Sequence, residues 1–346
     1  MVAHWLAVEG VQPTIPQNPT TADLRTTDLI PKGPSTNTLS ALAGSDNITI
    51  KPLVKHVVSK ELILFFDKIR AAILDRDNDP SVISLRESAL ESIRSDPGLQ
   101  QLVPYYVQFI AEKVTHNLHD IFVLKQMIDL TTAIVSNPNL SVDAYVSPLI
   151  PPVLTCLLGR HIGMPSPNIQ QLKEKYALRD LSSSVLHQIV QKYAKSSTEL
   201  QTRLARTCLK VFLDPSRTLE EHYGAIIGLA AVGGAPAIES LVIPSLKTFE
   251  YVIKKAEKEL EGKSDEIGET AMKMLVAGIM KGVIMLVEGE EVNAAGERMN
   301  GVEGAGSEEE KKAVEEFLGS AIGNRVAGSG NAVLIKKILE IKESGL

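Results

Sequence analysis

Apolar residues recur at helical spacing through most of the chain and predict a series of helices joined by short turns. From about residue 53 onward they return every three or four positions, which is the period of an α-helix with one buried face. The breaks between the periodic stretches hold Pro, Gly, Asp and Asn, as in DRDNDP, SDPG, SNPN, GMPSPN, DPSRT and GGAP. No stretch alternates apolar and β-branched residues with polar ones in the manner of a strand. We therefore predict an all-α protein with helices over 53–74, 81–95, 99–116, 119–136, 142–160, 173–194, 197–213, 219–232, 236–260 and 265–288.

One motif occurs three times: a turn, followed by an apolar helix with a proline near its start. SDPGLQQLVPYYVQFI contains Pro104, SNPNLSVDAYVSPLIPPVL contains Pro148, and GGAPAIESLVIPSLKTF contains Pro244. Pro104 and Pro148 are 44 residues apart, and Pro148 and Pro244 are 96 apart, or two steps of 48. This step is close to the roughly 40–47 residues of HEAT and armadillo units. A proline in the first turn of a helix removes no hydrogen-bond donor, so each of these prolines sets how its helix begins.

The helix that follows in each unit also repeats. SVISLRESALESI follows Asp79 and Pro80 and contains Arg86, and KYALRDLSSSVLHQI contains Arg179 followed by Asp180. This order resembles the HEAT signature, and we expect the arginine to pair with a turn aspartate of its own or the neighbouring unit. A lone helix pair cannot bury both of its apolar faces, but a stack can. The sequence therefore predicts a HEAT-repeat solenoid of about five helix pairs with a C-terminal capping region.

The composition divides the chain into four segments. Residues 1–51 are rich in Pro, Thr, Asn and Ser and are predicted to form an extended linker. Residues 52–288 form the predicted repeat domain, 289–307 a flexible loop rich in Gly and Glu, and 308–346 terminal helices that cap the array. Ser307 and Glu310 have the spacing of a capping box at the start of the first terminal helix.

Charge and cysteine content narrow the classes of function. The net charge is −6, with the acidic excess in residues 261–346, which disfavours nucleic-acid binding by the protein as a whole. Cys156 and Cys208 lie in apolar helical surroundings and are predicted to be small core residues, which is typical of an intracellular protein. The most apolar stretches, such as AIIGLAAVGG, fall short of the roughly 18 residues of a membrane span.

Three features suggest chemistry, and each has a simpler structural interpretation. His116, His119 and Asp120 have spacing that suits a metal, but they straddle a predicted turn and more often cap helix ends. Glu221 and His222 begin a predicted helix, where acidic residues favour the helix dipole. GSGN at 328–331 lacks the lysine and the preceding strand of a phosphate-binding loop. We predict a protein that is not an enzyme and has no catalytic, cofactor-binding or metal-binding residues.

A basic stripe is the one candidate for a nucleic-acid contact. Arg203, Arg206 and Lys210 share one face of a predicted helix, at spacings of three and four. The simpler interpretation is a solvated outer face, and the alternative is a contact with the phosphate backbone of DNA or with an acidic partner.

Several long motifs resemble one family of transcription factors. HWLAVEGVQPTIPQNP, LVKHVVSKELILFFDKI, IRSDPGLQQLVPYYVQFIAEKVTHNLHD, NPNLSVDAYVSPLIPPVLTCLLG, YALRDLSSSVL and FLDPSRTLEEHYGAIIGLAAVG occur in this order between His4 and about Leu246. They are similar to the C-terminal part of the TFIID subunit 6 family of TATA-binding-protein-associated factors. The resemblance implies a nuclear scaffold made of HEAT repeats, which follows a histone fold in the family and joins subunits of TFIID, and possibly of SAGA, for assembly of the RNA polymerase II preinitiation complex. It implies other TFIID subunits as partners, with TFIID subunit 9 binding the histone fold, and no membrane, cofactor or small-molecule substrate.

Overall fold

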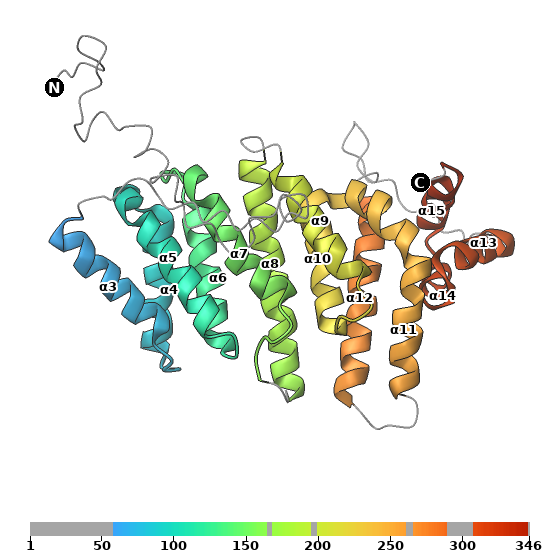
Figure 1. The fold of residues 1–346 in the computed structure, drawn as a ribbon, viewed down its shortest axis with the longest axis horizontal. Coiled ribbons are helices and arrows are strands. Elements are labelled where there is room, and N and C mark those ends of the chain that lie inside the picture. The colour runs from blue at the N-terminus through green and yellow to red at the C-terminus, as the bar shows by residue number, and fades with distance from the viewer. Residues whose placement is uncertain (1–57, 165–167, 195–198, 261–265, 289–306, 345–346) are drawn as a thin grey trace, which may run out of the picture. The chain divides into compact units, whose positions relative to one another are not determined.

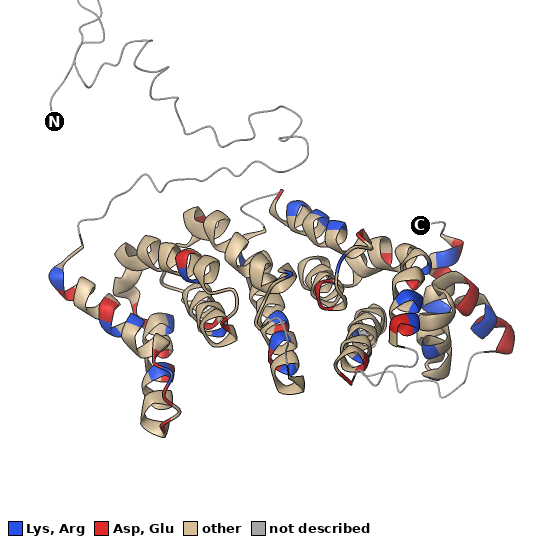
Figure 2. Cartoon of the chain, turned by 60° about the horizontal axis from the view of Figure 1, so that its bottom comes forward, with Lys and Arg blue, Asp and Glu red and all other residues tan. Residues whose placement is uncertain are grey.

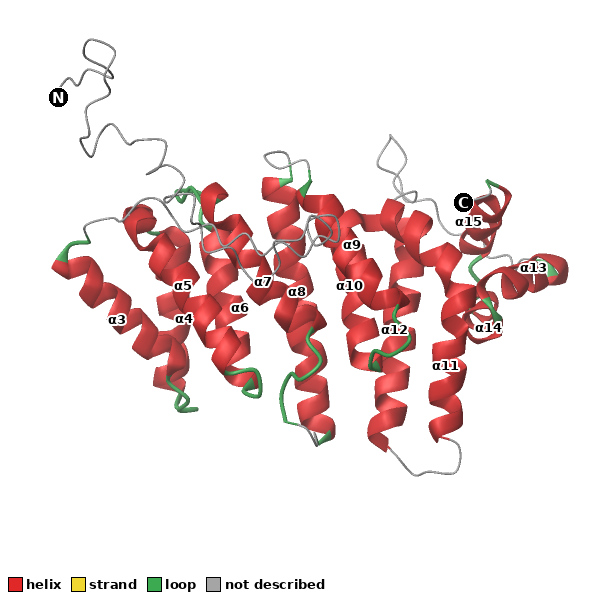
Figure 3. Cartoon of the chain, in the orientation of Figure 1, coloured by secondary structure: helices red, strands yellow, loops and turns green. Residues whose placement is uncertain are grey.

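Every secondary-structure element that the structure describes is a helix or a helical turn (Figure 3). The computed structural model describes residues 58–164, 168–194, 199–260, 266–288 and 307–344, all of which lie in the unit Lys51–Leu346. The predicted linker over 1–51, and all of the predicted loop over 289–307 except Ser307, lie outside the described residues.

The described helices form successive pairs, in which we call the first helix A and the second helix B (Figure 1). Each A helix packs against its own B helix, and each B helix packs against the next one along the chain. This confirms the predicted all-α solenoid of about five helix pairs. The pairs are α3 (Lys60–Leu74) with α4 (Pro80–Ser95), α5 (Val103–His116) with α6 (Ile121–Ser136), α7 (Val146–Leu158) with α8 (Ile169–Tyr193), α9 (Leu200–Leu213) with α10 (Leu219–Ala237), and α11 (Leu246–Leu260) with α12 (Glu266–Glu288).

Hydrogen bonds between successive pairs connect residues about one repeat apart. The Asn137 amide donates to the carbonyl of Ile93 at 2.7 Å and to that of Asp96 at 3.0 Å. The Ser183 hydroxyl donates to the carbonyl of Ile227 at 3.0 Å, and Nδ1 of His187 lies 2.7 Å from the carbonyl of Ala231. Three of these four contacts span 44 residues. The periodicity in the sequence therefore corresponds to the register in which the B helices stack.

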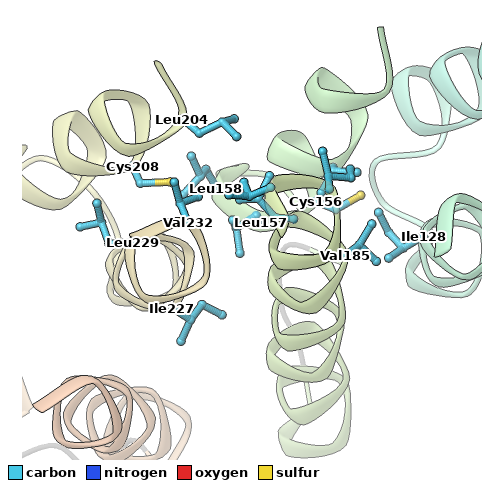
Figure 4. Close-up of a cluster of buried hydrophobic side chains, with 14 of the residues drawn as sticks. Ile128, Cys156, Leu157, Leu158, Val185, Leu204, Cys208, Ile227, Leu229 and Val232 are labelled. Atoms are coloured by element: carbon cyan, nitrogen blue, oxygen red, sulfur yellow. The ribbon is translucent and has the colours of Figure 1, made fainter. Parts of the chain in front are cut away.

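A continuous apolar core runs between the A and B helices. Figure 4 shows part of it, where Cys156 and Cys208 lie among leucine, isoleucine and valine side chains of several helices. Both cysteines are fully buried, and burial raises the pKa of each thiol to about 12. The prediction that they are core residues is confirmed.

The repeated prolines lie where A helices begin. Pro104 is the second residue of α5 and Pro148 is the third residue of α7, both in a first turn that needs no donor from them. Pro244 lies in the short 3-10 turn Ile243–Ser245, directly before α11. The helix predicted from residue 53 begins at Lys60, where the Ser59 hydroxyl accepts from the backbone N–H of Leu62.

A kink separates the fourth pair from the fifth. Gly234 has a φ of +58°, a conformation that side-chain-bearing residues rarely adopt, and it interrupts α10 near the predicted stop GGAP. The short helical turns Ile238–Val242 and Ile243–Ser245 then lead into α11.

Two stretches, Leu219–Leu260 and Glu266–Val287, are long and apolar enough to cross a membrane by length and composition alone. The expectation that the apolar stretches fall short of a span is therefore wrong. About half of each apolar window is buried, 50% and 56% respectively, and Leu229 and Leu275 belong to the core of the solenoid. Core packing therefore accounts for the hydropathy of both stretches.

Three terminal helices close the described part of the chain: α13 (Glu308–Leu318), α14 (Ser320–Gly328) and α15 (Ala332–Glu343). Helices α13 and α14 pack against α11, and α15 packs against α12. Ser307 and Glu310 form the predicted capping box at the start of α13. Glu250 of α11 accepts hydrogen bonds from the Ser320 hydroxyl at 2.6 Å and from the Ser320 backbone N–H at 2.8 Å, which fixes the start of α14 on the fifth pair.

Candidate interaction surfaces

The two repeated arginines cap the A helix of their own pair. Arg179 of α8 is fully buried and donates to the carbonyls of Leu157 and, at 2.9 Å, of Gly159, where α7 ends. Arg86 of α4 donates to the carbonyl of Asp75, where α3 ends. The last carbonyls of a helix have no partner within it, so each arginine satisfies groups that would otherwise be buried and unpaired.

Each of these arginines also contacts the next pair. The guanidinium of Arg86 lies over the ring of Phe122 in α6, 5.0 Å from its centroid. The guanidinium of Arg179 lies 3.8 Å from a carboxylate oxygen of Glu220 in α10. Arg86 thus bonds a turn aspartate of its own pair, through the backbone carbonyl of Asp75. Arg179 does not have the expected aspartate partner, because it bonds the carbonyls of Leu157 and Gly159 and lies near Glu220.

Asp79, Pro80 and Asp180 occupy structural positions. Asp79 is the N-cap of α4 but makes no side-chain capping bond, and Pro80 is the first residue of that helix. Asp180 accepts a hydrogen bond from the Tyr223 hydroxyl of the next pair at 2.7 Å. This bond contributes to the raised pKa of Tyr223, for which burial is the larger cause.

A group of charged side chains joins the third and fourth pairs around the start of α10. Lys175 lies 3.8 Å from Glu220, and Arg217 donates to Glu221 at 2.9 Å. Glu221 also forms a capping box with Thr218. Burial acts to raise the pKa of Glu221, but the hydrogen bonds from Thr218 and Arg217 act more strongly in the opposite direction. The pKa of Glu221 therefore lies below its usual value. Glu221 is therefore a structural carboxylate at a helix start.

The other clusters that suggested chemistry are also parts of helix ends. Asp120 caps α6 by accepting from the backbone N–H of Val123 at 3.3 Å, and Nδ1 of His119 lies 3.2 Å from the carbonyl of Gly163. His222 is fully buried, which lowers its pKa to about 4, and its ring lies edge-on to Phe249. Within the described ranges, no group of three or more His, Cys, Asp or Glu side chains is placed to hold a metal ion.

The B helices of the last three pairs enclose an open hollow. Its lining includes four small residues: Ala230 and Ala231 of α10, and Gly278 and Gly282 of α12. Ser184 of α8 and Lys281 of α12 lie at its exposed edge. The sequence did not indicate this hollow, because it forms only when three helices that are distant in the sequence stack together.

The predicted basic stripe lies on the A side of the fourth pair. Arg203, Arg206 and Lys210 of α9 are all exposed, and no carboxylate pairs with them among the described residues. Elsewhere in the described chain, acidic and basic residues are interspersed along the row of helices (Figure 2). A second basic stripe, not predicted from the sequence, consists of Lys247, Lys255 and Lys258 on α11. Tyr251 lies on the same face, since the four residues follow one another at helical spacings of four, four and three.

The stacked pairs, the capping arginines and the exposed surfaces define the chain as a HEAT-type helical-repeat solenoid. The family model described as the TAF6 C-terminal HEAT repeat domain matches residues 54–247, more than half of the chain. The chain belongs to this family.

Comparison with known proteins gives relatives in fungi and plants. The chain is 42% identical over 277 residues to the Schizosaccharomyces pombe protein named SAGA complex/transcription factor TFIID complex subunit Taf6, covering 77% of this chain and 59% of the relative. It is 34% identical over 249 residues to the Arabidopsis thaliana transcription initiation factor TFIID subunit 6, covering 72% of this chain and 42% of the relative. The chain thus spans about half the length of these two relatives. A solved structure, the TAF6 C-terminal domain from Antonospora locustae, is 26% identical with a TM-score of 0.46, covering 64% of this chain and 99% of that structure.

Proposed function

We propose that this chain is a scaffold subunit of TFIID, and of SAGA as well, which holds other subunits together for assembly of the RNA polymerase II preinitiation complex. The observation that carries this proposal is the family match, because the S. pombe relative is named as a subunit of both complexes. The protein acts in the nucleus and is not an enzyme. Its partners are other subunits of these complexes, with TFIID subunit 9 as the partner that binds the histone fold in the family.

The structure supports this role through its shape and its connections. A solenoid offers a long surface relative to its core, and the bonds between successive pairs keep that surface in one arrangement. Affinity in such a surface comes from a few anchoring side chains of the partner, and the hollow between α8, α10 and α12 is one place that can receive them. Four segments serve this function: the linker 1–51, the repeat domain 52–288, the loop 289–307 and the capping helices 308–346.

Crosslinking mass spectrometry of complexes purified through a tag on this chain tests the proposal. We expect lysines of the solenoid, including Lys281 at the edge of the hollow, to crosslink to several different TFIID or SAGA subunits. Crosslinks confined to the chain itself, in a sample where known neighbouring subunits do crosslink to one another, would contradict the scaffold role.

A further inference from the structure

Two A helices present unpaired cations to solvent. On α9 these are Arg203, Arg206 and Lys210, and on α11 they are Lys247, Lys255 and Lys258. All six are exposed, and none pairs with a carboxylate in the part of the chain that the structure describes. By contrast, Lys254 on the same helix pairs with Glu250 at 3.0 Å. The six cations are therefore available to a ligand.

The same two helices expose large apolar side chains beside their cations. The rings of Phe212 and Phe249 are stacked with centroids 4.6 Å apart, so the last turn of α9 lies against the first turn of α11. Leu213, which follows Phe212, is 52% exposed, and Tyr251, two residues beyond Phe249, is 66% exposed. Large apolar side chains left in water beside a row of cations are a feature of surfaces that bind other proteins.

We propose that this surface, which we call the α9/α11 face, binds an acidic segment of a partner protein. Carboxylates of the segment pair with the six cations, and one or two of its apolar side chains cover Leu213 and Tyr251. Charge complementarity supports this occupant, because each of the two helices exposes three cations without a carboxylate partner among the described residues, in a chain whose net charge is −6. The inference deepens the proposed scaffold function, on which it rests, by naming the chemistry of one partner.

The apolar side chains favour a peptide over nucleic acid. The phosphate backbone of a duplex would pair with the cations but would leave Leu213 without a partner. Acidic residues also border the face: Asp214 follows Leu213, and Glu257 and Glu259 are exposed near the end of α11. They would repel a continuous phosphate backbone more than a short segment, which can place its carboxylates at the cations alone.

Fluorescence anisotropy with the whole chain tests the proposal, using labelled synthetic probes. The main probe is a peptide that combines glutamates with two leucines; its matched forms replace either the glutamates by Gln or the leucines by Ser. Duplex and single-stranded oligonucleotides of equal charge complete the set, since bases of a single strand stack on aromatic side chains. We expect the chain to bind the main peptide more tightly than both matched peptides and both oligonucleotides.

Variants assign this binding to the α9/α11 face. The triple change Arg203→Glu, Arg206→Glu, Lys255→Glu should weaken binding of the main peptide by at least about tenfold. The matched control Lys68→Glu, Lys312→Glu, Lys336→Glu alters three exposed lysines elsewhere by the same charge and should weaken it much less. The double change Leu213→Ser, Tyr251→Ser should weaken binding of the main peptide. It should leave binding of the peptide without leucines unchanged. Thermal unfolding of each variant establishes that the fold is kept.

The outcomes separate this proposal from the scaffold function. Tighter binding of either oligonucleotide than of the main peptide would contradict the proposal and favour nucleic acid as the ligand. An equal loss of peptide binding in the control variant would contradict it as well and indicate unspecific charge attraction. If no peptide binds but the chain still crosslinks to other TFIID subunits, the α9/α11 proposal fails and the scaffold function stands. If the peptide binds and no subunit crosslinks, the proposed assembly role fails instead.

Discussion

Arg179 of α8 donates a hydrogen bond to the carbonyl of Gly159 at the end of α7, at 2.9 Å, from a fully buried position. A second bond goes to the carbonyl of Leu157, and Glu220 of α10 lies 3.8 Å from the same guanidinium. A single side chain thus caps one helix of its own pair and contacts the following pair. Burial lowers the pKa of Arg179, an effect that Glu220 opposes.

Replacing Arg179 by methionine should destabilise the solenoid by about 3 kcal/mol, because it leaves two buried carbonyls and part of Glu220 without a partner. Urea unfolding followed by circular dichroism measures the loss. Arg206→Met on the exposed side of α9 is the matched control and should change stability by no more than about 0.5 kcal/mol. Equal effects of the two substitutions would show that Arg179 does not hold the third and fourth pairs together.

Gly224 is predicted to be irreplaceable where α10 crosses the end of α7. A methyl group at this position would lie 2.1 Å from the Leu157 carbonyl oxygen that Arg179 bonds. Gly224→Ala should therefore cost about 2 kcal/mol or more, since the backbones must separate. Gly328→Ala, at the end of α14 with nothing within 4 Å, should change stability by less than about 1 kcal/mol. The melting temperature should fall much more in Gly224→Ala than in Gly328→Ala, and equal melting temperatures would contradict this prediction.

The contact between Glu250 and Ser320 should make the attachment of the terminal helices depend on pH. The hydrogen bond from the Ser320 hydroxyl, together with Lys254 and the backbone N–H of Ala321, lowers the pKa of Glu250 to about 2. Because the folded pKa lies below the unfolded value of about 4.3, the stabilisation is complete above that value and is lost as the pH falls towards 2. Glu250→Gln should therefore lower the melting temperature at pH 6 and make a smaller difference at pH 3. A difference that stays constant between these pH values would rule out this linkage.

Cys156 and Cys208 should resist thiol reagents in the native protein. Burial raises the pKa of both thiols to about 12 and also blocks access to them. Titration with Ellman's reagent should detect almost no reaction in buffer and both thiols in denaturant. Rapid reaction of either thiol in buffer would mean that the third or fourth pair opens locally.

The repeat period, some helix starts and the all-α class were predictable because they depend on local patterns. Pro104 and Pro148 lie in the first turns of their helices, and Ser307 and Glu310 form a capping box. Each of these features depends only on residues that are close in the sequence. The partner of Arg179 was not predictable, because it is a backbone carbonyl 22 residues away that only the folded helix pair brings within reach.

The surfaces were harder to predict than the fold. Arg203, Arg206 and Lys210 were visible as one stripe, but the contact between α9 and α11 through Phe212 and Phe249 was not. The hollow on the B side has no signature in the sequence, because residues such as Ala231 and Gly278 read as ordinary helix positions. Interaction sites of a solenoid arise from the juxtaposition of repeats.

Quantitative mass spectrometry of proteins that co-purify with the tagged chain tests the scaffold function most directly. The comparison uses the unaltered chain, the hollow-edge variant Ser184→Arg, Lys281→Glu, and the control variant Lys336→Glu on α15, after thermal unfolding has shown that all three are folded. The scaffold function predicts that TFIID and SAGA subunits are enriched with the unaltered chain and the control, and that one or more are reduced several-fold with the hollow-edge variant. No enrichment of these subunits with the unaltered chain would contradict it, and equal amounts with all three would show that the hollow does not anchor a partner.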